Sequence, residues 1–260
     1  MIELSRLTKR YGDRPVVHEL SLSVAKGELL VLLGGSGSGK TTTLKMISRL
    51  IEPSSGKVTI DGAPTDELEG HVLRRKIGYV FQKVGLFPHM TVADNVATPL
   101  SLAGWSEDRI AARVAEMLDM VDLEPAIAQR FPRELSGGQA QRVGFARALA
   151  AEPRLMLLDE PFGALDPVTR DKLQQSFIAI RRRLDLTAVF VTHDMVEALL
   201  IADRIAVLNE GRLVQIGTPK ELMESPADAY VERLFEMPRR QARALGEVMA
   251  GSGAAGREPS

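Results

Sequence analysis

Short apolar runs separated by polar segments dominate the first third of the chain, and this pattern predicts strands buried in a core. Residues 28–33 are apolar almost throughout, as expected of a strand covered on both faces. A glycine-rich segment follows this run, and residues 40–50 then have the pattern of a helix. The strands predicted in this part of the chain are 2–7, 16–24, 28–33, 58–61 and 77–81.

The pattern changes in the middle of the chain, where apolar residues recur with helical spacing. This spacing extends over about 84–152 and is clearest at 109–121, which form an amphipathic helix. Strand-like runs return afterwards, and the turn Asn209-Glu210-Gly211 predicts a hairpin. The elements predicted in this last part are strands at 155–158, 188–191, 205–208 and 213–216 and helices over about 168–184 and 219–237.

These elements predict an α/β fold with one large domain over 1–237. Its parts are a nucleotide-binding core with a mixed sheet flanked by helices, an antiparallel β part at the N-terminus and a helical subdomain inserted at about 84–152. The remaining residues, 238–260, are predicted to be a partly disordered tail, because their end is rich in glycine and alanine.

Composition excludes several classes of function. Lys and Arg total 33 and Asp and Glu total 34, so the net charge of −1 gives no electrostatic basis for binding nucleic acid. The absence of cysteine excludes disulfides and thiolate metal sites, and it suits a reducing cytoplasm. No apolar run approaches the roughly 20 residues that cross a bilayer, and the first residues do not have the pattern of a signal peptide. If the protein works at a membrane, other subunits must cross it.

A phosphate-binding loop lies between the strand at 28–33 and the following helix. The segment from Gly34 to Thr41 fits the pattern G-x-x-x-x-G-K-[ST] in full, whereas the spacing of its glycines does not fit a dinucleotide fingerprint. Lys40 can reach the β- and γ-phosphates and the Thr41 hydroxyl can bind Mg²⁺. A chance glycine-rich turn would not require a strand before it and a helix after it. The predicted phosphate-binding residues are Gly34, Gly35, Ser36, Gly37, Ser38, Gly39, Lys40, Thr41 and Thr42.

Two carboxylates follow the apolar strand at 155–158. Asp159 is in the position to hold Mg²⁺, and Glu160 would be the base that activates the attacking water. Taken alone, these residues fit equally well the solvated acidic end of a strand. The phosphate-binding loop earlier in the chain favours the catalytic interpretation.

A second candidate phosphate-binding loop has the sequence Leu135-Ser136-Gly137-Gly138-Gln139. Ser136 can cap a helix that begins near Gln139, while Gly137 and Gly138 leave backbone amides uncovered. On these residues alone, an ordinary capped helix is an equal alternative. Two such loops in one chain suggest an ATP site that is shared between two copies.

Histidine and aromatic residues add less. His193 follows the strand at 188–191, at the edge of the sheet where ligands bind, so it is a candidate to contact the γ-phosphate. A lone histidine is usually structural, and this prediction rests on position. His18, His71 and His89 show no metal-ligand spacing, and by residue type alone Tyr11 and Trp105 favour packing roles.

Together these motifs resemble the ATP-binding subunit of ABC transporters, over nearly all of the chain up to about residue 237. The most specific element is the segment 135–139 with its continuation Gln141-Arg142-Val143. Two departures are Gly35, where many members have proline, and Gly163, where many have serine. Neither removes a ligand, although Gly163 lacks a hydroxyl at the dimer centre.

The resemblance implies a P-loop NTPase core of the ABC ATPase type, ATP and Mg²⁺ as cofactors, and specific roles for individual residues. Mg²⁺ would be bound by Thr41, Gln82 and Asp159, and the catalytic residues would be Lys40, Gln82, Glu160 and His193, with His193 as the switch histidine. Tyr11 would stack on adenine, and Gln82 would also contact the membrane subunit. Asp166 would link the two sites of the dimer. The residues that would contact the nucleotide of the opposite copy are Ser136, Gly137, Gly138 and Gln139.

A closer likeness, carried by residues 45–53, 77–80, 85–92, 104–105 and 161–167, is to importers of quaternary amine osmoprotectants such as glycine betaine, choline and carnitine. It implies a homodimer on the cytoplasmic face of the membrane, with transmembrane permease subunits and, indirectly, a substrate-binding protein. Many members carry a pair of CBS modules after the ATPase domain, and none is expected within this sequence.

Other functions remain as alternatives. A soluble ABC-type ATPase of DNA repair, chromosome organisation or translation would carry long coiled-coil insertions or tandem ATPase domains, which this sequence lacks. A P-loop GTPase or kinase would not need the second loop, and the GTPase motif Asn-Lys-x-Asp is missing. Import of amino acids, polyamines or a lipid-related compound stays open, as does export.

Overall fold

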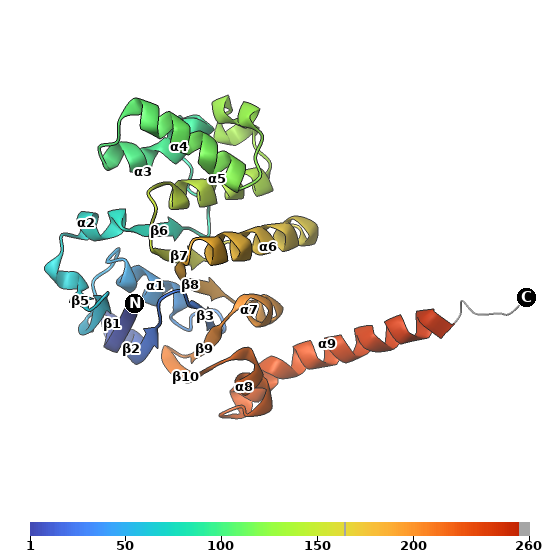
Figure 1. The fold of residues 1–260 in the computed structure, drawn as a ribbon. Coiled ribbons are helices and arrows are strands. Elements are labelled where there is room, and N and C mark those ends of the chain that lie inside the picture. The colour runs from blue at the N-terminus through green and yellow to red at the C-terminus, as the bar shows by residue number, and fades with distance from the viewer. Residues whose placement is uncertain (164, 255–260) are drawn as a thin grey trace, which may run out of the picture.

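The computed structural model describes residues 1–163 and 165–254, and these form two sheets with helices around them (Figure 1). The larger sheet has six strands in the order β10-β9-β3-β8-β7-β6, of which only β10 runs antiparallel to its neighbour. The predicted α/β fold is therefore confirmed. The strands of this sheet are β3 (Leu29–Leu33), β6 (Ile77–Val80), β7 (Leu155–Asp159), β8 (Thr187–Thr192), β9 (Arg204–Asn209) and β10 (Arg212–Gly217).

The smaller sheet is antiparallel and lies beside the larger one (Figure 1). Its strands are β1 (Ile2–Tyr11), β2 (Arg14–Val24), β4 (Ser55–Ile60) and β5 (Ala63–Pro64). Ile2 and Leu4 of β1 are buried while Glu3 and Ser5 are exposed, so one face of this sheet covers the core and the other meets solvent.

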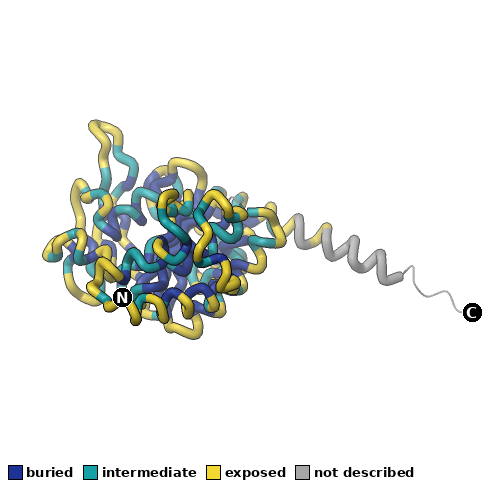
Figure 2. Tube along the Cα trace, turned by 90° about the horizontal axis from the view of Figure 1, so that it is seen from above, coloured by how far each residue is buried: buried dark blue, intermediate teal, exposed yellow. Residues whose placement is uncertain are grey.

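The central strands are apolar without alternation because both faces of the large sheet are covered. Leu30 and Leu32 belong to the core between the two sheets, together with helix α1 (Lys40–Ile47), whereas Val31 and Leu33 belong to the core on the opposite face. Figure 2 shows buried segments, in dark blue, in the middle of the body. The rigid sheet that results holds the loops at its carboxyl edge.

The predicted helical segment folds into a layer above β6 and β7 (Figure 1). It contains α3 (Val92–Leu102), α4 (Glu107–Met120) and α5 (Gly137–Ala150), and α2 (Gly70–Arg75) precedes it. Thr91 starts α3 with a capping box, in which its hydroxyl accepts from the Asp94 amide and the Asp94 carboxylate accepts from the Thr91 amide. The bounds of an inserted subdomain remain a prediction.

The final part of the chain contains α6 (Pro167–Arg183), α7 (Met195–Ile201), α8 (Pro219–Glu224) and α9 (Ala229–Ala254). The prediction of one helix over 219–237 is wrong. Ser225 and Pro226 interrupt it because proline has no amide to donate, and α9 starts at a new cap, the Asp228 carboxylate, which accepts from the amides of Tyr230 and Val231.

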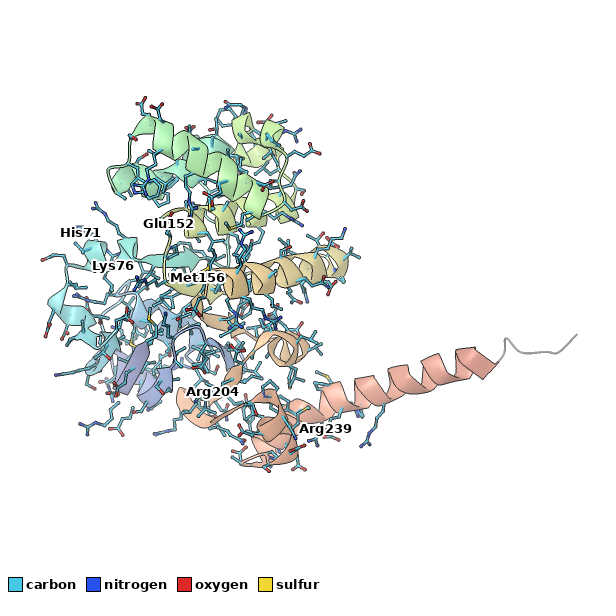
Figure 3. All side chains as sticks on the ribbon, viewed as in Figure 1. His71, Lys76, Glu152, Met156, Arg204 and Arg239 are labelled. Carbon is cyan, nitrogen blue, oxygen red and sulfur yellow. The ribbon has the colours of Figure 1, made fainter. Side chains whose placement is uncertain are left out.

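The helix α9 also continues well past the predicted end at Met237. Val231 and Phe235 are buried against the body, and beyond them the helix projects outward, with Arg239 on the projecting part (Figures 1 and 3). Pro238 lies inside the helix, and good helix formers such as arginine, alanine and leucine follow it. Residues 238–254 are helical where the sequence predicted a partly disordered tail, 255–260 lie outside the described residues, and partial disorder of the tail stays a prediction. None of the helices described in the chain is long and apolar enough to span a bilayer.

Candidate nucleotide-binding and catalytic site

The first loop is packed on one side and open on the other. A Cβ on Gly34 would collide with the carbonyl oxygen of Leu208, and a Cβ on Gly39 would lie 2.9 Å from the carbonyl oxygen of Val16. Gly39 has φ 93° and is the N-cap of α1, so glycine is favoured there on conformational grounds too. On the other side a Cβ on Gly35 or Gly37 would meet nothing within 4 Å. The loop therefore offers uncovered backbone at a helix start, which suits phosphate.

Lys40 is folded into this loop. Its Nζ donates to the carbonyl oxygens of Gly34 and Gly35 at 2.8 and 2.9 Å, and lies 3.3 Å from the Ser38 hydroxyl. The side chain is buried, and this burial lowers the pKa of the ammonium group, an effect that the nearby carboxylates of Glu160 and Asp159 partly oppose. The predicted contact with phosphate requires the amine to turn out of the loop. Of the other predicted loop residues, Ser36 is exposed and Thr42 is partly buried.

Thr41 and Asp159 are paired next to the loop. The Thr41 hydroxyl donates to Asp159 Oδ1 at 2.8 Å, which joins the first turn of α1 to the end of β7. Asp159 is 5% exposed, and burial raises the pKa of its carboxyl group, while the bond from Thr41 acts in the opposite direction. A hydroxyl and a carboxylate beside a phosphate cradle form a set of oxygen ligands that Mg²⁺ accepts.

Mg²⁺ would need further oxygen ligands at this position. Within 1–163 and 165–254, no group of three or more His, Cys, Asp or Glu side chains is arranged to hold a metal ion. Mg²⁺ usually keeps water and phosphate oxygens and takes only one or two protein carboxylates. The Thr41–Asp159 pair therefore fits the metal of a nucleotide complex better than a stand-alone metal site.

Two predicted catalytic residues converge on a carboxylate oxygen of a third, Glu160. Gln82 Nε2 donates to Glu160 Oε2 at 3.1 Å, and His193 Nδ1 lies 3.2 Å from the same oxygen. They follow β6, β7 and β8, which are neighbours in the sheet, so their carboxyl ends meet at one edge. Glu160 has φ 45°, and its amide donates to the Val191 carbonyl oxygen at 3.0 Å, which fixes this unusual backbone in place. Gln82, predicted also as a metal ligand, bonds here to Glu160.

The second loop is a well-formed helix start. The Ser136 hydroxyl accepts from the Gln139 amide at 3.2 Å, and Gln139 Oε1 accepts from the Ser136 amide at 2.9 Å. The helix α5 thus begins at Gly137, two residues before the predicted start. A Cβ on Gly138 would lie 2.7 Å from Thr169 Cγ2 of α6, whereas a Cβ on Gly137 would meet nothing within 4 Å.

The remaining predicted residues lie at element ends. The Asp166 carboxylate caps α6 by accepting from the amides of Val168 and Thr169 at 3.1 and 3.0 Å. Hydrogen bonds from Thr169, chiefly from its side chain and then from its amide, lower the pKa of Asp166. Tyr11 is 54% exposed at the end of β1, with Lys9 Nζ 5.2 Å from the ring centroid. The tyrosine ring is thus accessible to an adenine.

Arg170 and Asp194 belong to this region, although the sequence patterns did not reveal them. Arg170 Nη1 lies 3.2 Å from Asp194 Oδ2, and Arg170 Nη2 donates to the Leu165 carbonyl oxygen at 3.3 Å. The spacing of Asp194 and Glu197 directly after His193 is a helix-start signal that points to Asp194. Nothing comparable marks Arg170, because its carboxylate partner Asp194 is 24 residues away and its nearer partner, Leu165, contributes only a backbone carbonyl.

Relatives with this set of motifs are known. The family model described as ABC transporter matches residues 17–163. The glycine betaine/carnitine/choline transport ATP-binding protein OpuCA of Bacillus subtilis (strain 168) is 52% identical over 92% of this chain and 63% of its own length. The spermidine/putrescine import ATP-binding protein PotA of Nitrosomonas europaea is 46% identical over 89% of this chain and 63% of its own length. The chain thus spans about three fifths of both relatives.

Solved structures give the same result. A dimeric, post-hydrolysis structure of the ATP-binding cassette MJ0796 bound to ADP and Pi superposes with a TM-score of 0.77 at 36% identity, covering 84% of this chain and 99% of that one. The family model, which matches residues 17–163, spans more than half of the sequence and includes β3, α1 and the helices α3, α4 and α5. The chain therefore belongs to the ABC transporter family and has the fold of its ATP-binding cassette.

Proposed function

We propose that this chain hydrolyses ATP to drive an importer of quaternary amine osmoprotectants such as glycine betaine, choline or carnitine. The convergence of Gln82 and His193 on one oxygen of Glu160, beside the Thr41–Asp159 pair, carries the catalytic part of the proposal. The relative named for glycine betaine, carnitine and choline transport, at 52% identity, supports the cargo.

The chain's own residues divide the work of hydrolysis. Mg·ATP supplies the reactive γ-phosphoryl group, with its charge partly neutralised by the metal. Asp159 and Thr41 hold the metal side of the nucleotide, and Lys40 leaves the carbonyl oxygens of Gly34 and Gly35 to pair with phosphate oxygens. Glu160 orients the attacking water and takes its proton, while His193 keeps the carboxylate in position.

The proposal includes two copies of the chain at each site. The phosphate-binding loop starts α1 in the core, and the Ser136 loop starts α5 in the helical layer (Figure 1), so the two loops of one copy belong to different parts of the fold. In a face-to-face pair, the Ser136 loop of one copy completes the site of the other. The dimeric cassette structure at 36% identity supports this arrangement.

An importer also requires partners at the membrane. Residues around 82–90 would press on transmembrane permease subunits when the two copies close, and a substrate-binding protein would deliver the cargo. The chain would then lie on the cytoplasmic face of the membrane. We assign the ATPase domain to 1–237, as the sequence predicted.

A polyamine importer is a second candidate. The spermidine/putrescine relative is 46% identical over nearly the same share of the chain, only a few percentage points below the osmoprotectant relative. The ATPase chemistry would be identical, because the residues described above contact nucleotide and not cargo.

The enzymatic part is tested by phosphate release from purified protein with Mg·ATP. Glu160→Gln keeps the size of the side chain but removes the base, so turnover should fall by about 10²-fold or more. Lys40→Ala serves as the comparison, because it should weaken nucleotide binding as well. Near-normal hydrolysis by Glu160→Gln would refute the role given to Glu160.

The cargo is tested by uptake into the host cell after deletion of the gene. Labelled glycine betaine, choline, carnitine and putrescine are offered separately, and the strain is complemented with the wild-type chain or with Glu160→Gln. Restoration of betaine, choline or carnitine uptake by the wild-type chain alone supports the proposal. Restoration of putrescine uptake alone would replace the cargo and keep the ATPase, and restoration of none would refute this cargo class.

A further inference from the structure

Two helices begin directly at residues of the candidate site. The Asp166 carboxylate caps α6, and the Asp194 carboxylate caps α7 by accepting from the Glu197 amide at 3.1 Å. Asp194 immediately follows His193, the residue that contacts Glu160. A movement of either helix start would therefore move a residue of the site.

Polar side chains join these two helices side by side. Arg170 Nη1 lies 3.2 Å from Asp194 Oδ2, and Gln174 Nε2 donates to Glu197 Oε1 at 2.7 Å. Arg170 and Gln174 are four residues apart on α6, and Asp194 and Glu197 are three apart at the start of α7, so each pair shares a face of its helix. Gln174 and Glu197 are buried, and breaking their bond would leave polar atoms unsatisfied.

Arg170 also binds the chain just before α6. Its Nη2 donates at 3.3 Å to the carbonyl oxygen of Leu165, the residue before Asp166. One planar guanidinium group thus joins the backbone of the Asp166 loop to the carboxylate that follows His193. A lysine, with one ammonium group, lacks the fork that spans both partners.

We propose that Arg170 is a positioning residue that couples the Asp166 loop to the His193 loop within one copy of the chain. When a second copy docks against the Asp166 loop, Arg170 transmits the displacement to Asp194 and so to the His193–Glu160 contact. This inference rests on the proposed ATPase function. The coupling through Arg170 would make hydrolysis depend on correct docking of the second copy.

The test uses the full chain and three measurements: kcat and KM for ATP, formation of the Mg·ATP dimer in the Glu160→Gln background, and Tm. Arg170→Gln removes the coupling, and Arg170→Lys keeps the charge without the fork. Asp194→Asn keeps a good N-cap for α7 but removes the charge facing Arg170. Gln175→Ala, an exposed site on the same helix, is the matched control.

Arg170→Gln is expected to lower kcat by about ten-fold or more, since misplacement of a catalytic group by about 1 Å costs up to about 10²-fold. KM and dimer formation should stay within about two-fold of the unmodified protein, because Arg170 bonds to Asp194 and Leu165, which belong to neither phosphate-binding loop. Arg170→Lys should remain slow, and Gln175→Ala should match the wild type. The double variant Arg170→Gln/Asp194→Asn should be no slower than the slower single variant, since both single variants already remove the bond between Arg170 and Asp194.

Wild-type kcat in Arg170→Gln, or additive losses in the double variant, would overturn the coupling. Parallel losses of kcat, dimer formation and Tm would also overturn it, in favour of a purely structural role. If Arg170→Gln does not fold, Asp194→Asn decides, with a loss of kcat expected and an unchanged kcat refuting the proposal. Absence of ATP hydrolysis in the wild type would instead refute the proposed function.

Discussion

His193 Nδ1 lies 3.2 Å from Glu160 Oε2, with the two residues placed by the ends of the adjacent parallel strands β8 and β7. Gln82 reaches the same oxygen from the end of β6 at 3.1 Å. The carboxylate that we propose to orient water is therefore held by two groups on different loops. Any change that moves one of these loops changes the geometry of the base.

Removal of the imidazole is the first change to consider. His193→Ala should reduce ATP turnover by about 10²-fold, because Glu160 loses the contact that orients it, while nucleotide affinity should change little. His193→Gln, which restores a hydrogen-bond donor, should recover part of the rate. Phosphate release measured over a range of ATP concentrations separates kcat from KM. A His193→Ala variant with wild-type kcat would show that the contact has no part in turnover.

Thr41 gives a metal-specific prediction. Thr41→Ala removes a proposed oxygen ligand of Mg²⁺ and leaves the backbone of the loop intact, so hydrolysis should require a higher Mg²⁺ concentration. Thr41→Ser retains the hydroxyl and should behave like the wild type. Magnesium titration of ATP hydrolysis at fixed nucleotide distinguishes the two variants. Identical titration curves for all three proteins would exclude Thr41 as a ligand.

The close approach of Gly138 and Thr169 predicts that a substitution at Thr169 will compensate for one at Gly138. A Cβ on residue 138 would lie 2.7 Å from Thr169 Cγ2, so Gly138→Ala should lower the free energy of unfolding by about 1–3 kcal/mol through overpacking. Adding Thr169→Ser removes that methyl group, keeps the hydroxyl and should restore most of the stability. Urea unfolding gives the comparison. If Gly138→Ala is as stable as the wild type, the contact is not tight in solution.

Glu197 predicts a dependence of stability on pH. Burial is the main cause that raises the pKa of its carboxyl group above 4.5, while bonds to Thr192 and Gln174 act in the other direction. Below the ordinary pKa the carboxyl group is neutral in both the folded and the unfolded chain. As the pH rises past the ordinary pKa, the unfolded chain releases this proton while the folded chain still holds it. The free energy of unfolding therefore falls with rising pH until the pH passes the raised pKa of the folded chain.

Glu197→Gln has no proton to lose and can still accept the bond from Gln174. Its free energy of unfolding should therefore exceed that of the wild type at about pH 7.5, and the difference should shrink towards pH 4.5. Urea unfolding of both proteins across this range measures the difference. A difference independent of pH would mean that ionisation of Glu197 is not its source.

Sequence patterns predicted the parts of the fold and of the site that depend on neighbours along the chain. The strand before Gly34, the two carboxylates at the end of β7 and the Ser136 cap are local features, and each lies where the sequence indicated. The inward position of Lys40 was not predictable, because it depends on carbonyl oxygens that only the folded loop brings together.

The end of α9 and the contacts of Arg170 were missed for different reasons. The end of α9 was misplaced because the glycines near the end of the chain favoured disorder, whereas the structure continues the helix through Pro238 to Ala254. The link from Arg170 to Asp194 depends on how α6 packs against α7, which no periodicity in the sequence records.

Two copies of the chain should share each ATP, and the molar mass of Glu160→Gln tests this arrangement most directly. Light scattering of the purified variant should give 28.4 kDa without nucleotide and twice that mass with Mg·ATP. Lys40→Ala combined with Glu160→Gln should remain at the lower mass in both conditions. A Glu160→Gln protein that binds ATP and stays at 28.4 kDa would contradict the shared site.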